Sequence, residues 1–313
     1  MSDPTPLQEA EATWHQLAGV VFPWDVTRSL ELALLKTFCV PSISALLDRT
    51  GEFAQRPRKR YDDTGLMVAE LLCHGVDSEA GAAVITRMNR IHGHYAISND
   101  DFLYVLSTFV AEPIRWLGRY GWRGLTAPEQ EHLFLFWRAV GQRMGIAAIP
   151  DSLAELLALN ERVERQVFTH APSNRRVADA TLAMLLADWP SPLRPALQRV
   201  LAALLDRQTA GSLGWPVAPG WLQQLVLAAL RLRSRAAAAA AGLAGWLGRQ
   251  PQARFYSRRP TPSYGASFRL DQLGPPPLLQ TLNDADATGA NTTGADATGA
   301  DAGRSEGGPP WGP

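Results

Sequence analysis

The sequence predicts an all-α fold, and three observations lead to this prediction. Apolar residues recur at helical spacing almost throughout residues 10–250. Helix start signals recur along the same stretch, whereas runs of alternating β-branched residues bounded by turns are almost absent. We therefore expect a single large helical domain over residues 1–282, with roughly nine to eleven helices and without a solenoid repeat.

The expected helices can be followed along the chain by their start and stop signals. Asp-Asp-Thr at residues 62–64 precedes the apolar pattern "GLMVAELLCHG", which ends at Gly75. Asp77 and Ser78 precede the next helix, which is expected over residues 79–94. A capping side chain satisfies backbone N–H groups that the first helical turn leaves without a partner, so these signals predict where each helix begins.

Further helices are predicted wherever such a signal stands ahead of an apolar run. The signals are Ser98 with Asp101, Thr126 with Glu129, Ser152 with Glu155, and Ser191 with Pro192. In most of these pairs an acidic residue lies three positions after a Ser or Thr, which is the spacing of a capping box.

The C-terminal part of the chain differs in composition from the helical region. Proline and glycine are frequent in residues 250–282, which predicts extended chain wrapping the surface of the helical domain. Residues 283–313 repeat the pattern Asp-Ala-Thr-Gly-Ala and contain one large apolar residue, Trp311. Such a segment cannot bury enough apolar surface to offset its ordering entropy, so we expect a disordered, low-complexity tail.

The charge balance, the cysteine count and the absence of several motifs exclude common classes of protein. The 30 Lys and Arg residues are matched by 30 Asp and Glu residues. The chain therefore lacks the excess of basic residues that would indicate a nucleic-acid partner. Cys39 and Cys73 are too few for a disulfide framework or a zinc finger. The Gly-rich phosphate-binding loops, the G-x-S-x-G elbow and the H-E-x-x-H zinc motif are all absent from the sequence.

The sequence predicts a cytoplasmic protein. Its acidic, polar N-terminus lacks the basic start and apolar core of a signal peptide. No uncharged apolar run reaches the roughly 18 residues that a transmembrane helix needs. Residues 236–248 come closest, and they follow Arg231, Arg233 and Arg235. Both a packed helix and a peripheral membrane contact are compatible with that stretch.

Two of the six histidines, His92 and His94, stand close together in the helix expected over residues 79–94. At about 100° per residue, His92 shares a helical face with Ile85 and Met88, while His94 is turned about 200° away. Asn89 lies one turn below His92. We therefore predict that His92 lies on the buried face and that His94 points elsewhere.

Three interpretations of His92 are open at this point. It is a core histidine bonded to a neighbour. It is the axial ligand of a non-covalent haem, which needs one neutral imidazole and a large apolar slot. Or it belongs to a non-haem metal site with His94 and Asp100 or Asp101. Asp101 could also accept a hydrogen bond from His92 and so strengthen its ligation, while His94 could reach a haem propionate; helix capping and a solvated loop position are the alternatives.

A pattern of spaced motifs in this region resembles the catalytic domain of MpaB-type oxygenases and rubber oxygenases. The motifs are N-R-I-H, N-D-D-F-L-Y, W-R-G-L-T-x-x-E and F-W-R-x-x-G-x-x-M-G-I, in this order. The similarity runs from about Trp24 to residues 268–275. The resemblance implies an all-helical fold that binds haem b through one proximal histidine, which corresponds here to His92. Met88, Asn89, Asp101 and His94 are then candidates for the surroundings of the haem.

The resemblance also implies residues for the distal side of the haem. Rubber oxygenases carry an Arg-x-x-Lys-Thr element there, and the matching stretch has Arg60 and Thr64 but places Asp63 where the lysine would stand. We expect Arg60 and Thr64 to act in catalysis and Asp63 not to bind the iron. The expected activity is a haem b-dependent oxygenase that uses O₂ to attack an alkene or activated C–H bond of a small or medium apolar substrate, such as an isoprenoid. A non-catalytic haem-binding or sensor protein is the alternative.

Overall fold

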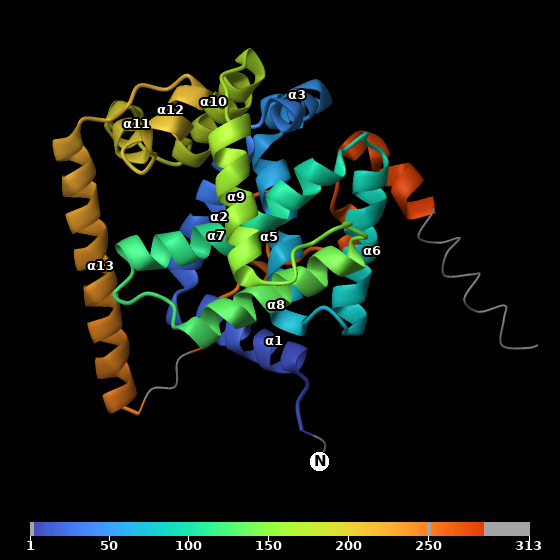
Figure 1. Cartoon of the computed structure of the whole chain (residues 1–313), viewed down its shortest axis with the longest axis horizontal. Coiled ribbons are helices and arrows are strands. Elements are labelled where there is room, and N and C mark those ends of the chain that lie inside the picture. The colour runs from blue at the N-terminus through green and yellow to red at the C-terminus, as the bar shows by residue number, and fades with distance from the viewer. Residues whose placement is uncertain (1–2, 249–251, 285–313) are drawn as a thin grey trace, which may run out of the picture.

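The computed structural model describes residues 3–248 and 252–284, and helices dominate both stretches (Figure 1). The α-helices are α1 (Pro6–Gln16), α2 (Pro23–Thr37), α3 (Pro41–Thr50), α4 (Glu52–Gln55), α5 (Pro57–His74), α6 (Glu79–Gly93), α7 (Asn99–Tyr120), α8 (Ala127–Arg143), α9 (Leu153–Val167), α10 (Pro172–Leu186), α11 (Arg194–Ala202), α12 (Arg207–Leu213) and α13 (Gly220–Trp246). The shorter elements are the π-helix η1 (Leu17–Val21) and the 3₁₀ turns η2 (Ser191–Leu193), η3 (Tyr256–Arg258), η4 (Leu270–Gln272) and η5 (Pro276–Leu278).

The all-α prediction is confirmed over the described residues, which form helices and no β-strand. Within them, Thr261 and Gly265 form an isolated β-bridge. There are more helices than we expected, because short segments such as α4 and α12 form helices of their own between the long ones. The stretch that we expected to be extended, residues 250–282, contains the turns η3, η4 and η5 and ends in a helical turn that runs from residue 279 to 284.

The predicted helix starts are confirmed where a local capping residue sets them. Thr126 and Glu129 form the capping box of α8, and Ser98 accepts from the backbone N–H of Asp101 at the start of α7. The start predicted at residues 62–64 is wrong, because α5 begins at Pro57 and carries that stretch inside it. Proline fits the first helical position, where its missing N–H costs nothing, and it starts the helix well before the acidic pair.

Two clusters of buried side chains fill the interior. The larger one lies around α5, α6, α7 and α8 and includes Trp14, Leu71 and Phe134. The second lies between α3, α10 and α12 and includes Phe38 and Leu213. Figure 1 shows α2, α5 and α7 in the middle of the molecule, with α1 and α8 at one end and α3, α10, α11 and α12 at the other. Helices α2 and α7 contribute to both clusters and therefore connect the two ends.

A largely buried ion cluster connects α2, α7 and α9. Lys36 donates to Glu112 at 2.8 Å and to Glu164 at 3.0 Å, and Arg115 contacts the same two carboxylates at 2.7 and 2.9 Å. The two cations and two anions alternate, so each buried charge has an opposite charge beside it. Such pairing is what makes burial of charges tolerable in a protein interior.

The start of the segment that we expected to be a disordered tail is held against the helical body. Asn283 accepts a hydrogen bond from Nη1 of the buried Arg87 at 2.9 Å, and Leu282 is buried. Arg87 also donates to the backbone carbonyls of Leu273 and Asp271. A single buried guanidinium therefore fixes the end of the described chain, and the rest of the expected tail, residues 285–313, lies outside the described residues.

Across the part of the chain that the structure describes, no single helix is long and apolar enough to cross a membrane. Helices α2 and α3, which are bent by 96° to one another, reach the required length and composition only as a pair.

Candidate functional site

A cavity of about 350 Å³ lies in the middle of the molecule, between α2, α3, α5, α6, α7 and α8. The C-terminal segment, residues 254–275, completes its wall. Most of the lining is aliphatic or aromatic, and it includes Leu30, Leu34, Ile43, Met67, Leu72, Ile91, Phe102, Val105, Phe109, Trp137 and Phe255. A concave apolar site with a few polar groups is the usual form of a binding site for a small molecule or cofactor.

His92 lines this cavity near the C-terminal end of α6, as its helical face predicted. Its ring stands edge-on to Phe102, with the ring centroids 5.4 Å apart. Its Nδ1 atom is buried and has no hydrogen-bond partner within the part of the chain that the structure describes. Burial, and secondly the positive charge of Arg60, lower the pKa of His92 to about 4. The imidazole is therefore neutral at neutral pH, which is the form that binds a metal.

Two of the other residues predicted beside His92 also line the cavity. Met88 does so from α6, and Asp101 does so from the first turn of α7. The Asp101 carboxylate accepts a hydrogen bond from Ser42 at 2.7 Å, and its backbone N–H donates to Ser98. Because Nδ1 of His92 has no partner, the predicted hydrogen bond from His92 to Asp101 is absent from this structure.

Asn89 and His94 lie outside the set of residues that line the cavity. The amide of Asn89 donates to the backbone carbonyl of Arg143 at 3.0 Å and so connects α6 to the end of α8. His94 is exposed, and its Nδ1 atom lies 2.8 Å from the carbonyl of Arg90. The opposite orientation predicted for His92 and His94 is therefore correct, while the proposed contacts of Asn89 and His94 with a cofactor find no support in their positions.

The same positions argue against a non-haem metal site made of His92, His94 and Asp101. His94 faces solvent at the helix end, and Asp101 is bonded to Ser42. Nowhere among the described residues do three or more His, Cys, Asp or Glu side chains come together in an arrangement that could hold a metal ion.

Arg60 and Thr64, the predicted distal residues, both line the cavity from α5. Nη1 of Arg60 donates to the Thr64 hydroxyl, which in turn donates to the Arg60 carbonyl at 3.1 Å. The Arg60 guanidinium also lies 5.7 Å from the centre of the Phe53 ring. Burial lowers the pKa of Arg60. Arg60 is thus a cation in the wall of an apolar cavity, and the carboxylates of Asp63 and Glu52 in the same wall offset part of its positive potential.

A carboxylate that sequence reasoning missed also reaches the cavity. Glu31, on α2, accepts a hydrogen bond of 2.5 Å from the hydroxyl of Tyr61, and both residues line the cavity. Arg28 pairs with the same carboxylate at 2.6 Å. Burial raises the pKa of Glu31. The Arg28–Glu31 spacing is visible in the sequence, but its contact with Tyr61, thirty positions away, depends on the packing of α2 against α5.

Asp63 holds the C-terminal segment in place. Its buried carboxylate accepts hydrogen bonds from Nζ of Lys59 at 2.9 Å, from the hydroxyl of Tyr264, and from the backbone N–H of Gly274 at 3.2 Å. Nζ of Lys59 also donates to the carbonyls of Gln272 and Gly274. The residue that stands in place of the rubber-oxygenase lysine therefore anchors the backbone that closes the cavity.

The neighbouring Asp62 anchors the same segment at a second point. It is fully buried and accepts from the hydroxyl of Tyr256 at 2.7 Å and from the backbone N–H of Ser263 at 3.0 Å. Near the start of the segment, the ring of Phe255 packs on Gly19, where a Cβ atom would come within 2.5 Å of it. We call residues 254–275, with these anchors, the C-terminal strap.

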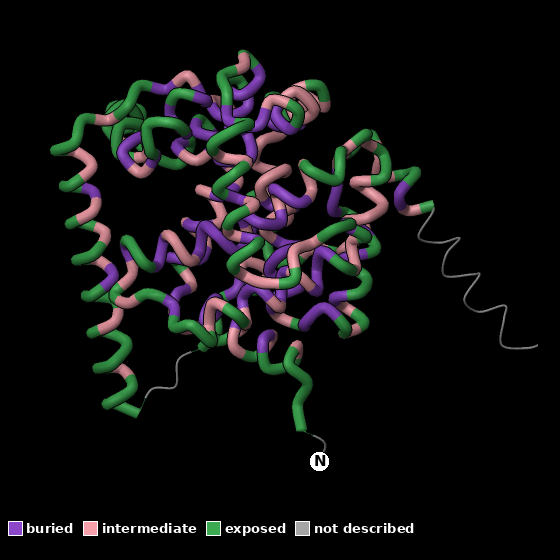
Figure 2. Tube along the Cα trace, viewed as in Figure 1, coloured by how far each residue is buried: buried purple, intermediate pink, exposed green. Residues whose placement is uncertain are grey.

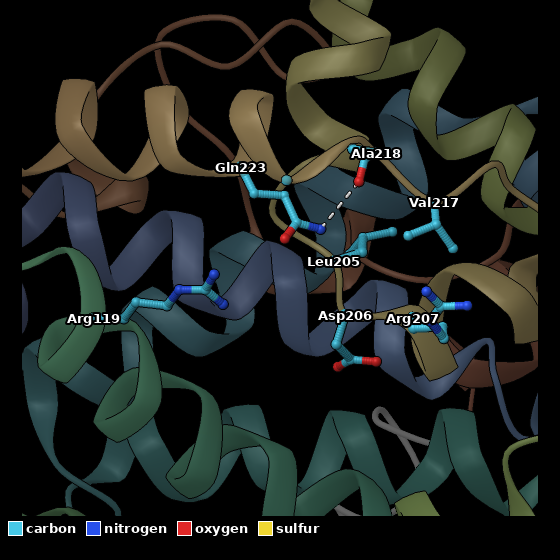
Figure 3. A pocket seen from close by; sticks show the side chains of 8 residues that line it. Arg119, Leu205, Asp206, Arg207, Val217, Ala218 and Gln223 are labelled. Atoms are coloured by element: carbon cyan, nitrogen blue, oxygen red, sulfur yellow. Dashed lines mark hydrogen bonds between the residues drawn. The ribbon is translucent and has the colours of Figure 1, made fainter.

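A second pocket, of about 400 Å³, lies on the surface between the end of α7, α12 and the start of α13 (Figure 3). Arg119 and Arg207 are exposed there, and Asp206 caps α12 by accepting from the backbone N–H of Thr209. The polar groups of this pocket serve the local backbone or face solvent, so it does not compete with the central cavity as a candidate site.

The residues of the central cavity fit a haem. His92 presents a neutral imidazole with a buried ring nitrogen that has no hydrogen-bond partner among the described residues. Axial ligation of a haem iron uses one such imidazole in an otherwise apolar slot. Arg60 supplies a buried cation in the same cavity.

Comparison with known proteins gives a consistent assignment. The family model described as "ER-bound oxygenase mpaB/B'/Rubber oxygenase, catalytic domain" matches residues 27–241. The chain is 29% identical to "ER-bound oxygenase mpaB'" of Penicillium brevicompactum over 233 residues, which cover 68% of this chain and 55% of that protein. It is 28% identical to "ER-bound oxygenase mpaB" of the same organism over 216 residues, covering 63% of this chain and 55% of the relative.

A third relative, "ER-bound oxygenase mpaB" of Penicillium roqueforti (strain FM164), is 26% identical over 217 residues, which cover 64% of this chain and 73% of the relative. The matched part thus spans about half the length of the first two relatives. The family match includes α3 to α12 and every side chain discussed here on α5 and α6. The chain belongs to the family of the mpaB/B' and rubber oxygenase catalytic domain.

Proposed function

We propose that this protein is a haem b-dependent oxygenase that acts on a small or medium apolar substrate. The observation that carries the proposal is the neutral imidazole of His92, which faces an apolar cavity with one buried ring nitrogen unpartnered. His92 would hold the iron, and a bound haem would supply the activation of O₂. The family's oxygenase name supports the reaction class.

The walls of the cavity explain why the substrate should be apolar. Phe102, Phe109 and Trp137 provide broad aromatic surfaces, and aliphatic residues of α2 and α3 line the cavity as well. Removing apolar substrate surface from water contributes roughly 25 cal/mol per Å². With a substrate bound, the same walls would keep water from the reacting bond, which protects reactive groups from hydrolysis and strengthens electrostatic interactions.

Arg60 and Thr64 are the residues that we assign to charge stabilisation. The guanidinium of Arg60 is fixed by its hydrogen bond to Thr64, so its remaining N–H groups have a restricted orientation. A preorganised donor in a dry cavity stabilises developing negative charge far better than it would in water. Asp63 is not given such a role, because its carboxylate is engaged by Lys59, Tyr264 and the Gly274 backbone.

The names of the relatives narrow the substrate class within this proposal. The family name includes rubber oxygenases, and rubber is a polyisoprene. An unsaturated isoprenoid fits the aliphatic and aromatic lining of the cavity, with the alkene or an activated C–H bond as the point of attack.

The proposal can be tested by supplying the haem-loaded protein with a reductant, isotopically labelled O₂ and a panel of unsaturated isoprenoids. We expect labelled oxygen in a product, with a rate reduced at least about a hundredfold in Arg60→Met, which keeps the length of the side chain but removes its charge. The control is Arg58→Met, on the same helix, because Arg58 pairs with Asp188 and does not line the cavity. A haem-loaded protein that turns over no member of the panel would instead support the haem-binding or sensor alternative.

A further inference from the structure

Helix α13 stands along one flank of the molecule and shows a long exposed face (Figures 1 and 2). Its 27 residues, Gly220–Trp246, span about 40 Å at the usual rise per residue. Val226 and Ser234 are the fully buried residues of this helix. One side of α13 therefore packs on the protein body and the other side has no partner within the described residues.

The exposed side of α13 carries a stripe of large apolar side chains. The stripe consists of Trp221, Leu225, Leu232, Leu243 and Trp246, which are between 58% and 81% exposed. At 100° per residue they fall within a sector of roughly 60°, so they form a straight line along the helix. Isolated exposed leucines are common, but an aligned row with tryptophan at both ends is typical of a binding surface.

The charges of α13 are all of one sign. The helix contains no Asp or Glu, and its charged residues are Arg231, Arg233 and Arg235. Arg233 is already occupied, because it pairs with Asp25 at 2.6 Å and lies 3.9 Å from the Trp24 ring centre. Arg231 and Arg235 are exposed, and their helical angles place them along one edge of the apolar stripe; Nε of Arg231 also donates to the backbone carbonyl of Arg119 at 2.9 Å. The surface is thus apolar along its centre and cationic at its edge.

These charges decide between two partners that an apolar helical stripe could have. Arg231 and Arg235 lie two residues on either side of the middle of α13. In a parallel pair of copies along this stripe, the arginine edge of one helix would face the opposite edge of its partner, which offers no Asp or Glu; in an antiparallel pair centred on residue 233, Arg231 would face Arg235. Like charges placed opposite one another disfavour such a dimer. An anionic lipid surface has the complementary charge, and tryptophan side chains favour the membrane–water interface.

We propose that α13 binds in the plane of an anionic membrane surface, with its tryptophans and leucines inserted among the lipids and Arg231 and Arg235 on lipid headgroups. A helix of this type inserts its apolar face into the boundary between headgroups and acyl chains. The site concerns the surface of the protein and is independent of haem, so a failure of the proposed oxygenase activity leaves it standing.

The test is flotation of the full chain with vesicles of phosphatidylcholine, alone or mixed with phosphatidylglycerol. We expect the protein to float with the mixed vesicles and to be released by high salt, since surface charges are screened. The triple variant Trp221→Gln, Leu232→Gln, Trp246→Gln should bind at least about tenfold more weakly because it removes three of the apolar anchors. Arg231→Gln and Arg235→Gln should each weaken binding roughly fivefold.

The matched control is Ala237→Gln, which adds the same polar side chain on the other side of α13. It should bind as the wild type does, and all the variants should keep the wild-type melting temperature because the substituted side chains are exposed. Equal flotation of the triple variant and the wild type would overturn the proposal. So would a wild-type dimer in sedimentation experiments that the triple variant abolishes, combined with no binding to either kind of vesicle.

Discussion

Replacing Asp63 with alanine tests whether the C-terminal strap is held by this buried carboxylate. The substitution removes the acceptor of Lys59, of the Tyr264 hydroxyl and of the Gly274 backbone N–H. The Asp63 side chain is 4% exposed and that of Lys59 is 20% exposed, so water screens the pair only weakly. Removing one partner of a buried ion pair lowers the free energy of unfolding by about 3–5 kcal/mol.

The lower end of that range applies here, because Lys59 keeps the carbonyls of Gln272 and Gly274 as acceptors. We therefore expect Asp63→Ala to reduce the free energy of unfolding by about 3 kcal/mol. For a chain of this size, the melting temperature should fall by roughly 5–10 °C. Thermal unfolding followed by circular dichroism measures this change. Relative to the wild type, Asp63→Ala should exchange its backbone amide hydrogens faster in the strap, with a smaller increase in α8.

The control for this experiment is Asp100→Ala, which removes an exposed carboxylate from the first turn of α7 and should cost at most about 1 kcal/mol. If Asp63→Ala melts at the same temperature as the wild type, the anchoring role is wrong. In the haem-loaded protein, Asp63→Ala should leave the ferric absorption spectrum nearly intact. A changed spin state would show that this position acts at the iron after all.

Three more predictions concern the strap, the cavity and the tail. Gly19→Ala should destabilise the protein by about 1–3 kcal/mol in urea unfolding, because the new Cβ would lie 2.5 Å from the ring of Phe255; an unchanged midpoint would contradict this packing. Burial raises the pKa of Glu31 above its ordinary 4.5, so the native state keeps a proton that the unfolded chain releases, and stability falls as pH rises from 4.5 toward that raised pKa. In urea unfolding over the same pH range, Glu31→Gln should lack this fall in stability, so at the higher pH it should be more stable than the wild type. Stability curves of the two proteins that run parallel over this range would refute the prediction. Ending the chain after Asp284 should leave the melting temperature unchanged, and a drop of several degrees would show that the tail prediction is wrong.

Sequence reasoning succeeded where the determining interactions are local. The capping pairs that start α7 and α8 lie within three residues of each other, so the pattern contains the whole interaction. The orientation of His92 and His94 follows from the angle between positions of one helix. The start predicted at residues 62–64 failed because Pro57 provides an earlier start signal, which reasoning from the acidic pair overlooked.

The remaining site contacts depend on partners that are distant in the sequence. Asp101 bonds to Ser42 on α3, and Asn89 bonds to the Arg143 carbonyl on α8. Neither partner can be identified from periodicity, because each contact depends on how two helices pack. Glu31 was missed for the same reason, and the anchors of the strap on α5 join residues about two hundred positions apart.

The central claim is that His92, and not His94, holds a haem iron in the cavity. The most direct test is the absorption spectrum of the full chain purified with haem supplied, for the wild type, His92→Ala and His94→Ala. We expect a strong Soret band in the wild type and in His94→Ala, whose imidazole is exposed, and loss or displacement of the band in His92→Ala. A wild-type protein without Soret absorption would contradict the account, and so would a His94→Ala variant that loses haem while His92→Ala retains it.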